Sequence, residues 1–258
     1  MSDGGEVSMS SGRELDRIRI NEVSKHFTLR HTRAVKEVVV KGLKGRRRGL
    51  SEQFTALRDI SLTVGEGEAV ALLGRNGSGK STLLKLISGV MGADEGRIEV
   101  RGNIAGLIDV GAGFHPDLTG RENVFLNGAI LGMTEAKIHE QFDRIVAFSE
   151  IEDFIDNEVK FYSSGMFLRL AFAVAVHTDP DIFLVDEILA VGDEPFQHKC
   201  LDRIRELRDE GKCLVIVSHD LDMVSRFTER GIVLDKGEVI HDGPIDDAVT
   251  LLRRRAEG

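Results

Sequence analysis

A glycine-rich segment, GRNGSGKS at residues 74–81, fits the pattern GxxxxGKS/T at every fixed position. It follows the apolar run 69–73 and opens a helix-like segment, residues 82–87. A strand, a glycine loop and a helix form the context in which this pattern becomes a phosphate-binding loop. Glycines let backbone N–H groups turn inward around a phosphate chain, and the helix start adds the positive end of its dipole. The chain is therefore predicted to be an α/β protein that binds a nucleoside triphosphate.

The side chains at the end of this loop suit triphosphate chemistry. Lys80 can reach the β- and γ-phosphates, and the Ser81 hydroxyl can ligate Mg²⁺. The residues predicted to surround the phosphates are Gly74, Arg75, Asn76, Gly77, Ser78, Gly79, Lys80, Ser81 and Thr82.

Composition limits the class of protein further. The 258 residues are enough for one large α/β domain or two small ones. A formal charge of −9 argues against a protein that coats nucleic acid, since such domains are usually basic. Cys200 and Cys213 match no metal-ligand or CxxC spacing and are predicted to be unpaired thiols in a reducing compartment.

Residues 1–19 lack the apolar core of a secretory signal, and runs such as 170–176 are too short to cross a membrane. We expect a chain that is soluble by itself, so a membrane role would require a partner.

Short apolar or alternating runs predict strands in the first and last parts of the chain, with a helical block between them. The strand-like runs are residues 18–23, 54–64, 68–73, 96–102, 182–185, 213–217, 231–235 and 238–241. A capping box at Thr119 and Glu122 precedes the helical residues 124–131, and further helical runs follow at 138–146 and 165–177. The pattern predicts an α/β core interrupted by an inserted helical block.

Residues 29–53 are strongly basic and contain no Asp, in contrast to the acidic chain as a whole. One interpretation is a solvated, partly ordered loop. The other is a contact with anionic lipid head groups or with an acidic surface of a partner. The sequence leaves both open.

Two acids and a histidine follow the later strands. Asp186 and Glu187 close the strand 182–185, where the first acid can hold Mg²⁺ and the second can polarise an attacking water. Such an acidic pair is common in α/β proteins, but together with an upstream phosphate loop it indicates a nucleotide-hydrolysing site. His219 follows the strand 214–218, where a neutral imidazole could hydrogen-bond the γ-phosphate or the attacking water.

The segment YSSGM, residues 162–166, precedes the amphipathic run 167–173. A Ser/Gly turn at a helix start can receive an anion, and it can equally be a simple N-cap formed by Ser163 or Ser164. This segment resembles the signature sequence LSGGQ of the ATP-binding cassette (ABC) ATPases. It lies at the same place before Asp186 as the signature does, and an Arg, Arg169, follows it in the same way. The resemblance covers residues 18–250. It implies a P-loop NTPase of the ABC type, with a RecA-like core, an antiparallel β subdomain and an inserted α-helical subdomain.

The resemblance also implies roles for individual residues. Phe27 takes the place of the aromatic residue that stacks on adenine, Glu187 that of the catalytic base and His219 that of the switch histidine. Ser163 and Gly165 of one subunit would contact the γ-phosphate bound by a second copy, so that a homodimer closes head to tail around two ATP molecules. The further nucleotide contacts that the resemblance implies are Ser164, Met166 and Asp193.

The chain departs from the family pattern in three places. One of them, Ile188 where a Pro often follows the catalytic Glu, is expected to have little effect. The signature has Tyr, Ser and Met where Leu, Gly and Gln are usual, so its affinity for phosphate could differ. Residues 107–116 contain no Gln, whereas the family has there a Gln that senses Mg²⁺. The Gln would fall near Asp109 or Val110, and Asp109 is the only side chain at that place able to contact metal or water. It is assigned to Mg²⁺ together with Ser81 and Asp186.

The run GAGFHPDLTGREN, residues 111–123, resembles the ABC subunits that export bacterial surface polysaccharides such as O-antigen, galactan and teichoic acid. In this resemblance Glu122 and Asn123 face the coupling helix of a membrane permease. Some members have a C-terminal carbohydrate-binding domain, which this chain is expected to lack. The expected layout is a catalytic core of residues 16–108 and 181–250, a helical subdomain of residues 109–180 and a basic insertion of residues 29–53.

Taken together, these features predict a Mg²⁺-dependent ATP hydrolase at the cytoplasmic face of the cell membrane. It would work with two copies of a transmembrane permease, with no nucleic-acid partner, and drive the translocation of a lipid-linked polysaccharide. Two alternatives stay open. One is a soluble ABC ATPase that acts without a permease, and the other is an ABC exporter of a different substrate, such as a lipid or a drug.

Overall fold

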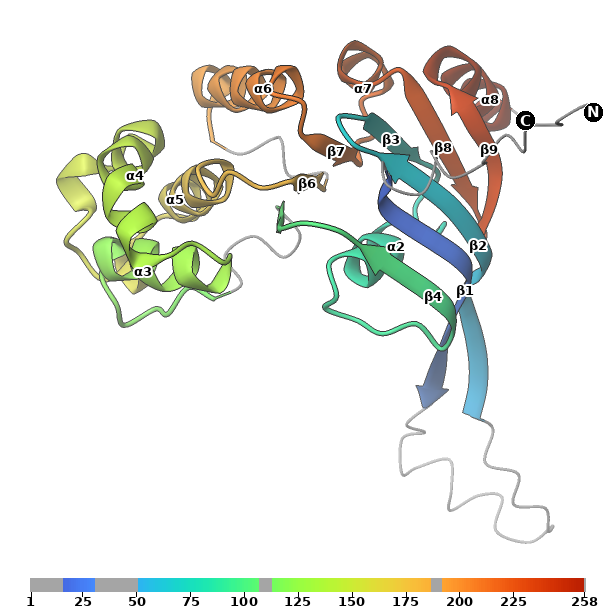
Figure 1. Ribbon diagram of the computed structural model, residues 1–258, viewed down its shortest axis with the longest axis horizontal. Coiled ribbons are helices and arrows are strands. Elements are labelled where there is room, and N and C mark those ends of the chain that lie inside the picture. Colours follow the sequence, from blue (N-terminus) through green and yellow to red (C-terminus); the bar gives the residue numbers. More distant parts are fainter. Residues whose placement is uncertain (1–15, 31–50, 107–112, 187–191, 258) are drawn as a thin grey trace, which may run out of the picture.

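The computed structural model describes residues 16–30, 51–106, 113–186 and 192–257 (Figure 1). Its central layer is a six-stranded sheet in the order β5-β6-β7-β3-β8-β9. All neighbouring strands are parallel except β8 and β9, which form an antiparallel hairpin. The strands are β3 (Ala69–Leu73), β5 (Ile104–Gly106), β6 (Ile182–Val185), β7 (Cys213–Ile216), β8 (Arg230–Asp235) and β9 (Glu238–Pro244). Strands β6 and β7 are buried along their whole length, which explains why they are continuous apolar runs without alternation.

A second sheet is antiparallel and has the order β2-β1-β4. It consists of β1 (Asp16–Arg30), β2 (Ser51–Gly65) and β4 (Glu95–Val100). One hydrophobic cluster joins this sheet, the helix α2 (Lys80–Ile87) and one face of the central sheet. The helix that begins at the phosphate loop is therefore held on both sides.

Helices cover the other face of the central sheet, as Figure 1 shows. They are α6 (Glu194–Asp209), α7 (Leu221–Phe227) and α8 (Ile245–Glu257). None of the three was predicted from the sequence, although α6 carries a visible signal: its buried side chains Phe196, Cys200, Ile204 and Leu207 recur with helical spacing.

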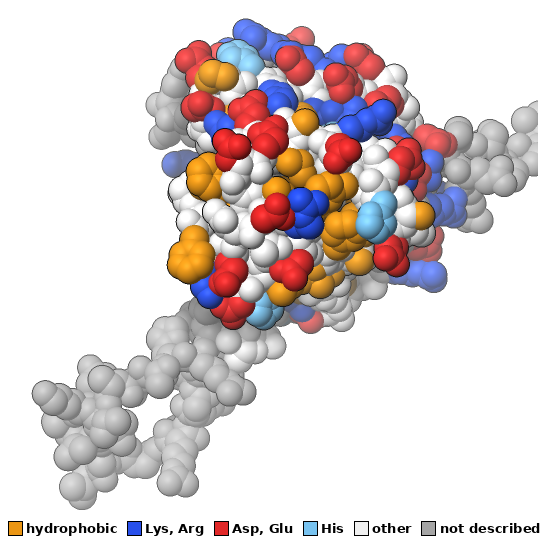
Figure 2. All heavy atoms as spheres, turned by 90° about the vertical axis from the view of Figure 1, so that its left-hand side faces the viewer, with side chains coloured by type: hydrophobic (Ala, Val, Ile, Leu, Met, Phe, Trp, Pro, Cys, Tyr) orange, Lys and Arg blue, Asp and Glu red, His pale blue; other side chains and the backbone are white. Residues whose placement is uncertain are grey.

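The remaining helices form a block with its own hydrophobic cluster, at the left of Figure 1. They are α3 (Gly120–Ile130), α4 (Glu135–Ser149), α5 (Ser164–Val176) and the short 3-10 helices η1 (Glu152–Phe154) and η2 (Val159–Phe161). The predicted capping box is confirmed, because the Glu122 N–H donates to Thr119 Oγ1 at 3.2 Å and the Thr119 N–H donates to Glu122 Oε2 at 2.8 Å. Figure 2, which looks onto this end of the molecule, shows apolar side chains between charged ones.

The predicted fold class is confirmed: an α/β core with an antiparallel subdomain and a helical insertion. Among the residues described, no helix combines the length and hydrophobicity needed to cross a bilayer. Most of the predicted basic insertion, residues 31–50, lies outside the described residues.

Both cysteines are free thiols, as predicted, and both are buried. Burial raises the pKa of Cys200 and of Cys213 to about 12. Only the thiolate reacts, and at pH 8 a thiol with such a pKa is ionised to roughly one part in ten thousand. We expect neither cysteine to react with Ellman's reagent in the folded protein at pH 8 and both to react in urea. Rapid release of thionitrobenzoate without denaturant would contradict this burial.

Candidate functional site

Three parallel strands bring the predicted site residues to one edge of the central sheet. Strands β6, β7 and β3 are neighbours, and their pairing places Val185 and Ala71 on either side of Ile216. The chain continues from β3 into the phosphate loop, from β6 into Asp186 and from β7 towards His219. Because parallel strands end at the same edge, the loop, the acid and the histidine lie at the carboxyl end of the sheet, where α/β proteins bind their ligands.

The phosphate loop adopts a conformation that two of its glycines make possible. Gly79 has φ +111° and is the N-cap of α2, and a Cβ there would lie 2.6 Å from Leu57 Cδ2 and 2.9 Å from the Ala56 carbonyl oxygen. Gly74 has φ +147°, and its Cβ would lie 2.6 Å from Ser78 Oγ. A side chain at either position would strain the backbone and clash with its neighbours, so both positions need glycine.

The polar groups of the loop suit a phosphate chain. Lys80 is buried, and its ammonium donates to the carbonyl oxygens of Gly74 at 2.8 Å and Arg75 at 3.3 Å. Ser78 Oγ is buried and has no hydrogen-bond partner among the described residues. Gly79 has no side chain that could cap the first N–H groups of α2, so these donors are directed to the loop. An anionic phosphate would satisfy all of these donors.

A cavity of about 380 Å³ lies against the loop. Six of the predicted phosphate-site residues line it, and so do two residues of β2 that were not predicted. The lining is Phe54, Ala56, Asn76, Gly77, Gly79, Lys80, Ser81 and Thr82. Phe27, the predicted adenine-stacking residue, is half-buried on β1 and does not belong to this lining.

Two of the three predicted Mg²⁺ ligands lie among the residues that the structure describes. Ser81 lines the cavity and Asp186 is half-buried at the end of β6, and a hydroxyl with a carboxylate is the hard oxygen chemistry that Mg²⁺ prefers. Asp109 and the predicted base Glu187 lie outside the described residues. Within the described part of the chain, no group of three or more His, Cys, Asp or Glu side chains could hold a metal ion.

The segment YSSGM forms the start of α5. Ser163 is the N-cap, and its hydroxyl accepts from the Met166 N–H at 3.2 Å, so the simple capping role is present. Ser163 and Ser164 are exposed. A Cβ on Gly165 would meet nothing closer than Ser163 Oγ at 3.8 Å. Figure 1 places α5 in the helical block, away from α2. The two predicted phosphate-binding helix starts therefore belong to different parts of the molecule.

A network of charges ties α5 to the core. Arg169 donates to Asp193 Oδ1 at 2.6 Å and to Glu150 Oε2 at 2.8 Å, and Lys199 donates to Glu150 Oε1 at 3.0 Å. The Lys199 hydrogen bond is the main reason that the pKa of Glu150 is lowered. The Arg169 guanidinium also lies 4.6 Å from the centre of the Phe196 ring. Asp193, predicted to contact nucleotide, is therefore joined to the signature helix.

The prediction that Asn123 faces a permease helix is wrong. Asn123 is fully buried, and its side chain accepts from the His115 N–H at 2.7 Å. Its amide group donates to the carbonyl oxygens of His115, Leu118 and Thr119. It holds the turn before α3 in addition to main-chain hydrogen bonds, such as that from the Leu118 N–H to the His115 carbonyl oxygen. Glu122 is exposed and belongs to the capping box. Its carboxylate accepts a hydrogen bond from the Thr119 backbone N–H, and this bond lowers the pKa of Glu122.

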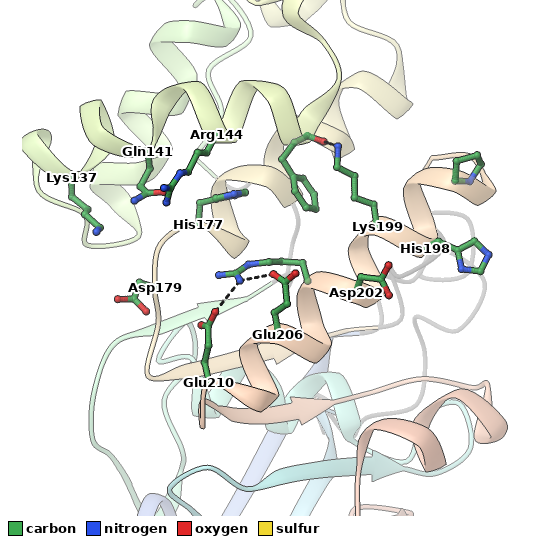
Figure 3. Close-up of a pocket in the computed structure, with 13 residues that line it drawn as sticks. Lys137, Gln141, Arg144, His177, Asp179, His198, Lys199, Asp202, Glu206 and Glu210 are labelled. Atoms are coloured by element: carbon green, nitrogen blue, oxygen red, sulfur yellow. Dashed lines mark hydrogen bonds and ion pairs between the residues drawn. The ribbon is translucent and has the colours of Figure 1, made fainter.

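A larger groove, of about 730 Å³, separates the helical block from α6 (Figure 3). It contains none of the predicted site residues. Its wall carries both signs of charge, and Arg203 donates to Glu206 at 2.8 Å and to Glu210 at 3.1 Å. The smaller cavity, which has the phosphate loop in its wall, is thus the better candidate for the nucleotide site.

Comparison with known proteins agrees with this geometry. The family model for ABC transporters matches residues 57–190, just over half of the chain. The O-antigen export system ATP-binding protein RfbB of Myxococcus xanthus is 47% identical over 230 residues, which are 87% of this chain and 53% of that protein. The RfbB protein of Klebsiella pneumoniae is 38% identical over 239 residues, which are 92% of this chain and 97% of the relative. The chain thus spans about half the length of the Myxococcus relative and nearly all of the Klebsiella one.

A solved structure has the same fold. The dimeric, post-hydrolysis ATP-binding cassette MJ0796, bound to ADP and Pi, superposes with a TM-score of 0.69 at 25% identity, over 88% of this chain and 98% of the other. The chain belongs to the ABC transporter family, and its fold is that of an ATP-binding cassette.

Proposed function

We propose that this chain is the ATP-hydrolysing subunit of an exporter that moves a lipid-linked polysaccharide across the cytoplasmic membrane. The observation that carries the proposal is the meeting of the phosphate loop, Asp186 and His219 at the carboxyl edge of β3, β6 and β7. The polysaccharide is inferred from two similar proteins that are named as O-antigen export proteins.

Each residue then has a task. The loop N–H groups and Lys80 bind the phosphates, and Ser81 with Asp186 would hold Mg²⁺, which neutralises phosphate charge when bound. Glu187 would take the proton of the attacking water, and His219 would hydrogen-bond the γ-phosphate. Asp109 remains a candidate for a further metal or water contact.

We further propose that the site is completed by a second copy of the chain. The start of α5, where Ser163 and Ser164 are exposed and Gly165 and Met166 are half-buried, would face the nucleotide held by the other subunit. Asp193 would approach the same interface, because Arg169 binds it to the signature helix at 2.6 Å. The MJ0796 cassette is described as dimeric, which is consistent with this arrangement.

The permease would dock on the helical block at the cytoplasmic face of the membrane. Three large apolar side chains of this block are exposed: Ile130 (57%), Phe154 (47%) and Phe161 (72%). Exposed aromatic side chains of this kind favour a protein partner. Two copies of a permease would match the two copies of the cassette.

Glu187→Gln tests the chemistry. We expect it to lower the rate of ATP hydrolysis at least about 100-fold while ATP still binds, because the amide keeps the shape of the carboxylate but cannot take a proton. Purified protein would be assayed for phosphate release and for binding of a fluorescent ATP analogue. Glu194→Gln, a change at an exposed acid at the start of α6, is the matched control and should behave as wild type. Hydrolysis by Glu187→Gln at the wild-type rate would refute the assigned mechanism.

The cargo needs a test in cells. In a strain that lacks this chain, the wild-type protein should restore polysaccharide at the cell surface and the Glu187→Gln variant should not. Accumulation of a different lipid or of a drug would favour the second alternative. Normal export together with a defect in the cytoplasm would favour a soluble ATPase without a permease.

A further inference from the structure

The turn between β8 and β9 lies against the phosphate loop. Lys236 and Gly237 form this turn, and both have left-handed backbone angles, with φ +50° and +83°. The Gly237 N–H donates to the carbonyl oxygen of Ser78, a residue of the phosphate loop, at 2.9 Å. A main-chain hydrogen bond between distant parts of the sequence thus connects the β8–β9 hairpin to the loop.

Strand β2 holds the turn from its other side. The Arg58 N–H donates to the Gly237 carbonyl oxygen at 2.8 Å. A Cβ on Gly237 would lie 2.6 Å from the Ala56 carbonyl oxygen, and the same oxygen would lie 2.9 Å from a Cβ on Gly79. The turn, β2 and the phosphate loop therefore pack backbone against backbone, and position 237 has no room for a side chain.

This contact determines the direction of the peptide group between Ser78 and Gly79. Among the described residues every peptide bond is trans. In a planar trans peptide the C=O and the N–H point in opposite directions. Because the Ser78 carbonyl points to the Gly237 N–H, the Gly79 N–H points away from the hairpin. Gly79 is the N-cap of α2 and lines the 380 Å³ cavity, so this donor lies where the free N–H groups of the helix start meet the cavity.

We propose that Gly237 is a positioning residue for phosphate binding: its N–H holds the Ser78 carbonyl, and this fixes the Gly79 N–H as a donor to the phosphates of ATP. Without this hydrogen bond the peptide group can rotate, because glycine at position 79 allows a wide range of backbone angles. A rotated peptide would turn the Ser78 carbonyl oxygen, an acceptor, towards the anionic phosphates. The inference rests on the proposed ATP site and adds a residue outside the phosphate loop on which the shape of the loop depends.

Gly237→Ala tests this role, because the new Cβ would meet the Ala56 carbonyl oxygen and displace the turn. We expect the affinities for ATP and for inorganic tripolyphosphate to fall by the same factor, about 10-fold, which corresponds to one hydrogen bond to a charged group. The two losses should be equal because tripolyphosphate has the phosphates without the base. Isothermal titration would measure both affinities, and thermal denaturation would measure the loss of stability separately.

Gly211→Ala is the matched control. Gly211 has φ +79° with open space around it, and its N–H donates to the Arg208 carbonyl oxygen at 2.9 Å. It precedes β7, which runs parallel to β3, so it lies at the edge of the sheet opposite to the phosphate loop. This variant should have the same backbone strain as Gly237→Ala and should bind both ligands like wild type.

A second variant removes only the donor. An ester in place of the Gly237 amide keeps glycine and its backbone angles, and the full chain can be assembled by ligating a synthetic C-terminal peptide. It should lose affinity for both ligands by the same factor of about 10. In ¹⁵N-labelled wild-type protein, saturating tripolyphosphate should shift the Gly79 amide proton downfield, and the shift should be smaller in Gly237→Ala.

Two results would overturn the inference while the proposed ATPase stands. One is wild-type affinity for tripolyphosphate in the ester variant, and the other is a Gly79 resonance that saturating tripolyphosphate leaves in place. A wild-type chain that binds neither ATP nor tripolyphosphate would overturn the proposed function as well.

Discussion

Lys80→Ala is expected to abolish measurable ATP hydrolysis and to weaken ATP binding about a thousand-fold. The ammonium group lies within the phosphate loop, 2.8 Å from the Gly74 carbonyl oxygen, and most of the side chain is screened from solvent. A cation about 4 Å from a phosphate charge at an effective dielectric constant near 20 contributes about 4 kcal/mol, which corresponds to roughly that factor. Isothermal titration with ATP and a phosphate-release assay would measure both effects.

Lys85→Ala provides the matched control for this loss. Lys85 lies in the last turn of the same helix, α2, and does not line the cavity. Its removal should change ATP affinity by less than about two-fold and confirm that the helix itself tolerates a lost lysine. If Lys80→Ala bound ATP like wild type, the cavity beside the loop would not be the triphosphate site.

Local features of this protein could be predicted from the sequence because each depends on a short segment. The phosphate loop, the acid after β6 and the capping box at Thr119 follow from spacing and from the period of apolar residues over about ten positions. The parallel order of β6, β7 and β3 then brings the loop, Asp186 and His219 together, as the resemblance had implied.

Other features depend on contacts between distant segments. The place of Phe54 in the cavity lining depends on the register of β1 against β2, which shifts between Lys25 and His26, and no local pattern indicates this shift. The resemblance implied that Asn123 faces a permease, yet its buried side chain makes hydrogen bonds to the 115–119 turn. Residues that lie in one motif can thus have separate tasks, with Glu122 at the surface and Asn123 in the interior.

The link between the signature helix and the core is another tertiary feature. Glu150 ends α4 in the left-handed region, with φ +57°, which is unusual for a residue other than glycine. This position lets one carboxylate accept from Arg169 of α5 and from Lys199 of α6. Glu150 thereby joins the helical block to α6, beside the second link that Arg169 makes to Asp193. A displacement of α5 would accordingly be transmitted to Asp193.

Gly165→Asp is expected to lower the rate of ATP hydrolysis at least about a thousand-fold. The variant should still fold, and its monomer should still bind ATP. The position tolerates a side chain, because a Cβ would meet only Ser163 Oγ at 3.8 Å, and an acid in the first turn is favourable for a helix. In the proposed dimer the new carboxylate would face the γ-phosphate of the other subunit. Repulsion between these two anions would prevent closure, and groups that stabilise the γ-phosphate in the transition state account for factors of this size.

The measurement combines three assays on one variant: phosphate release, ATP titration and the dimer fraction in ATP by analytical ultracentrifugation. Gly92→Asp adds the same charge at another glycine with open space around it and should leave all three unchanged. Mixing the Gly165→Asp and Lys80→Ala variants should restore part of the activity. In a mixed head-to-tail dimer, one site combines the intact phosphate loop of the Gly165→Asp subunit with the intact signature of the Lys80→Ala subunit. Wild-type hydrolysis by Gly165→Asp alone would show that the start of α5 acts only as a helix cap and that the phosphate loop works without a second copy.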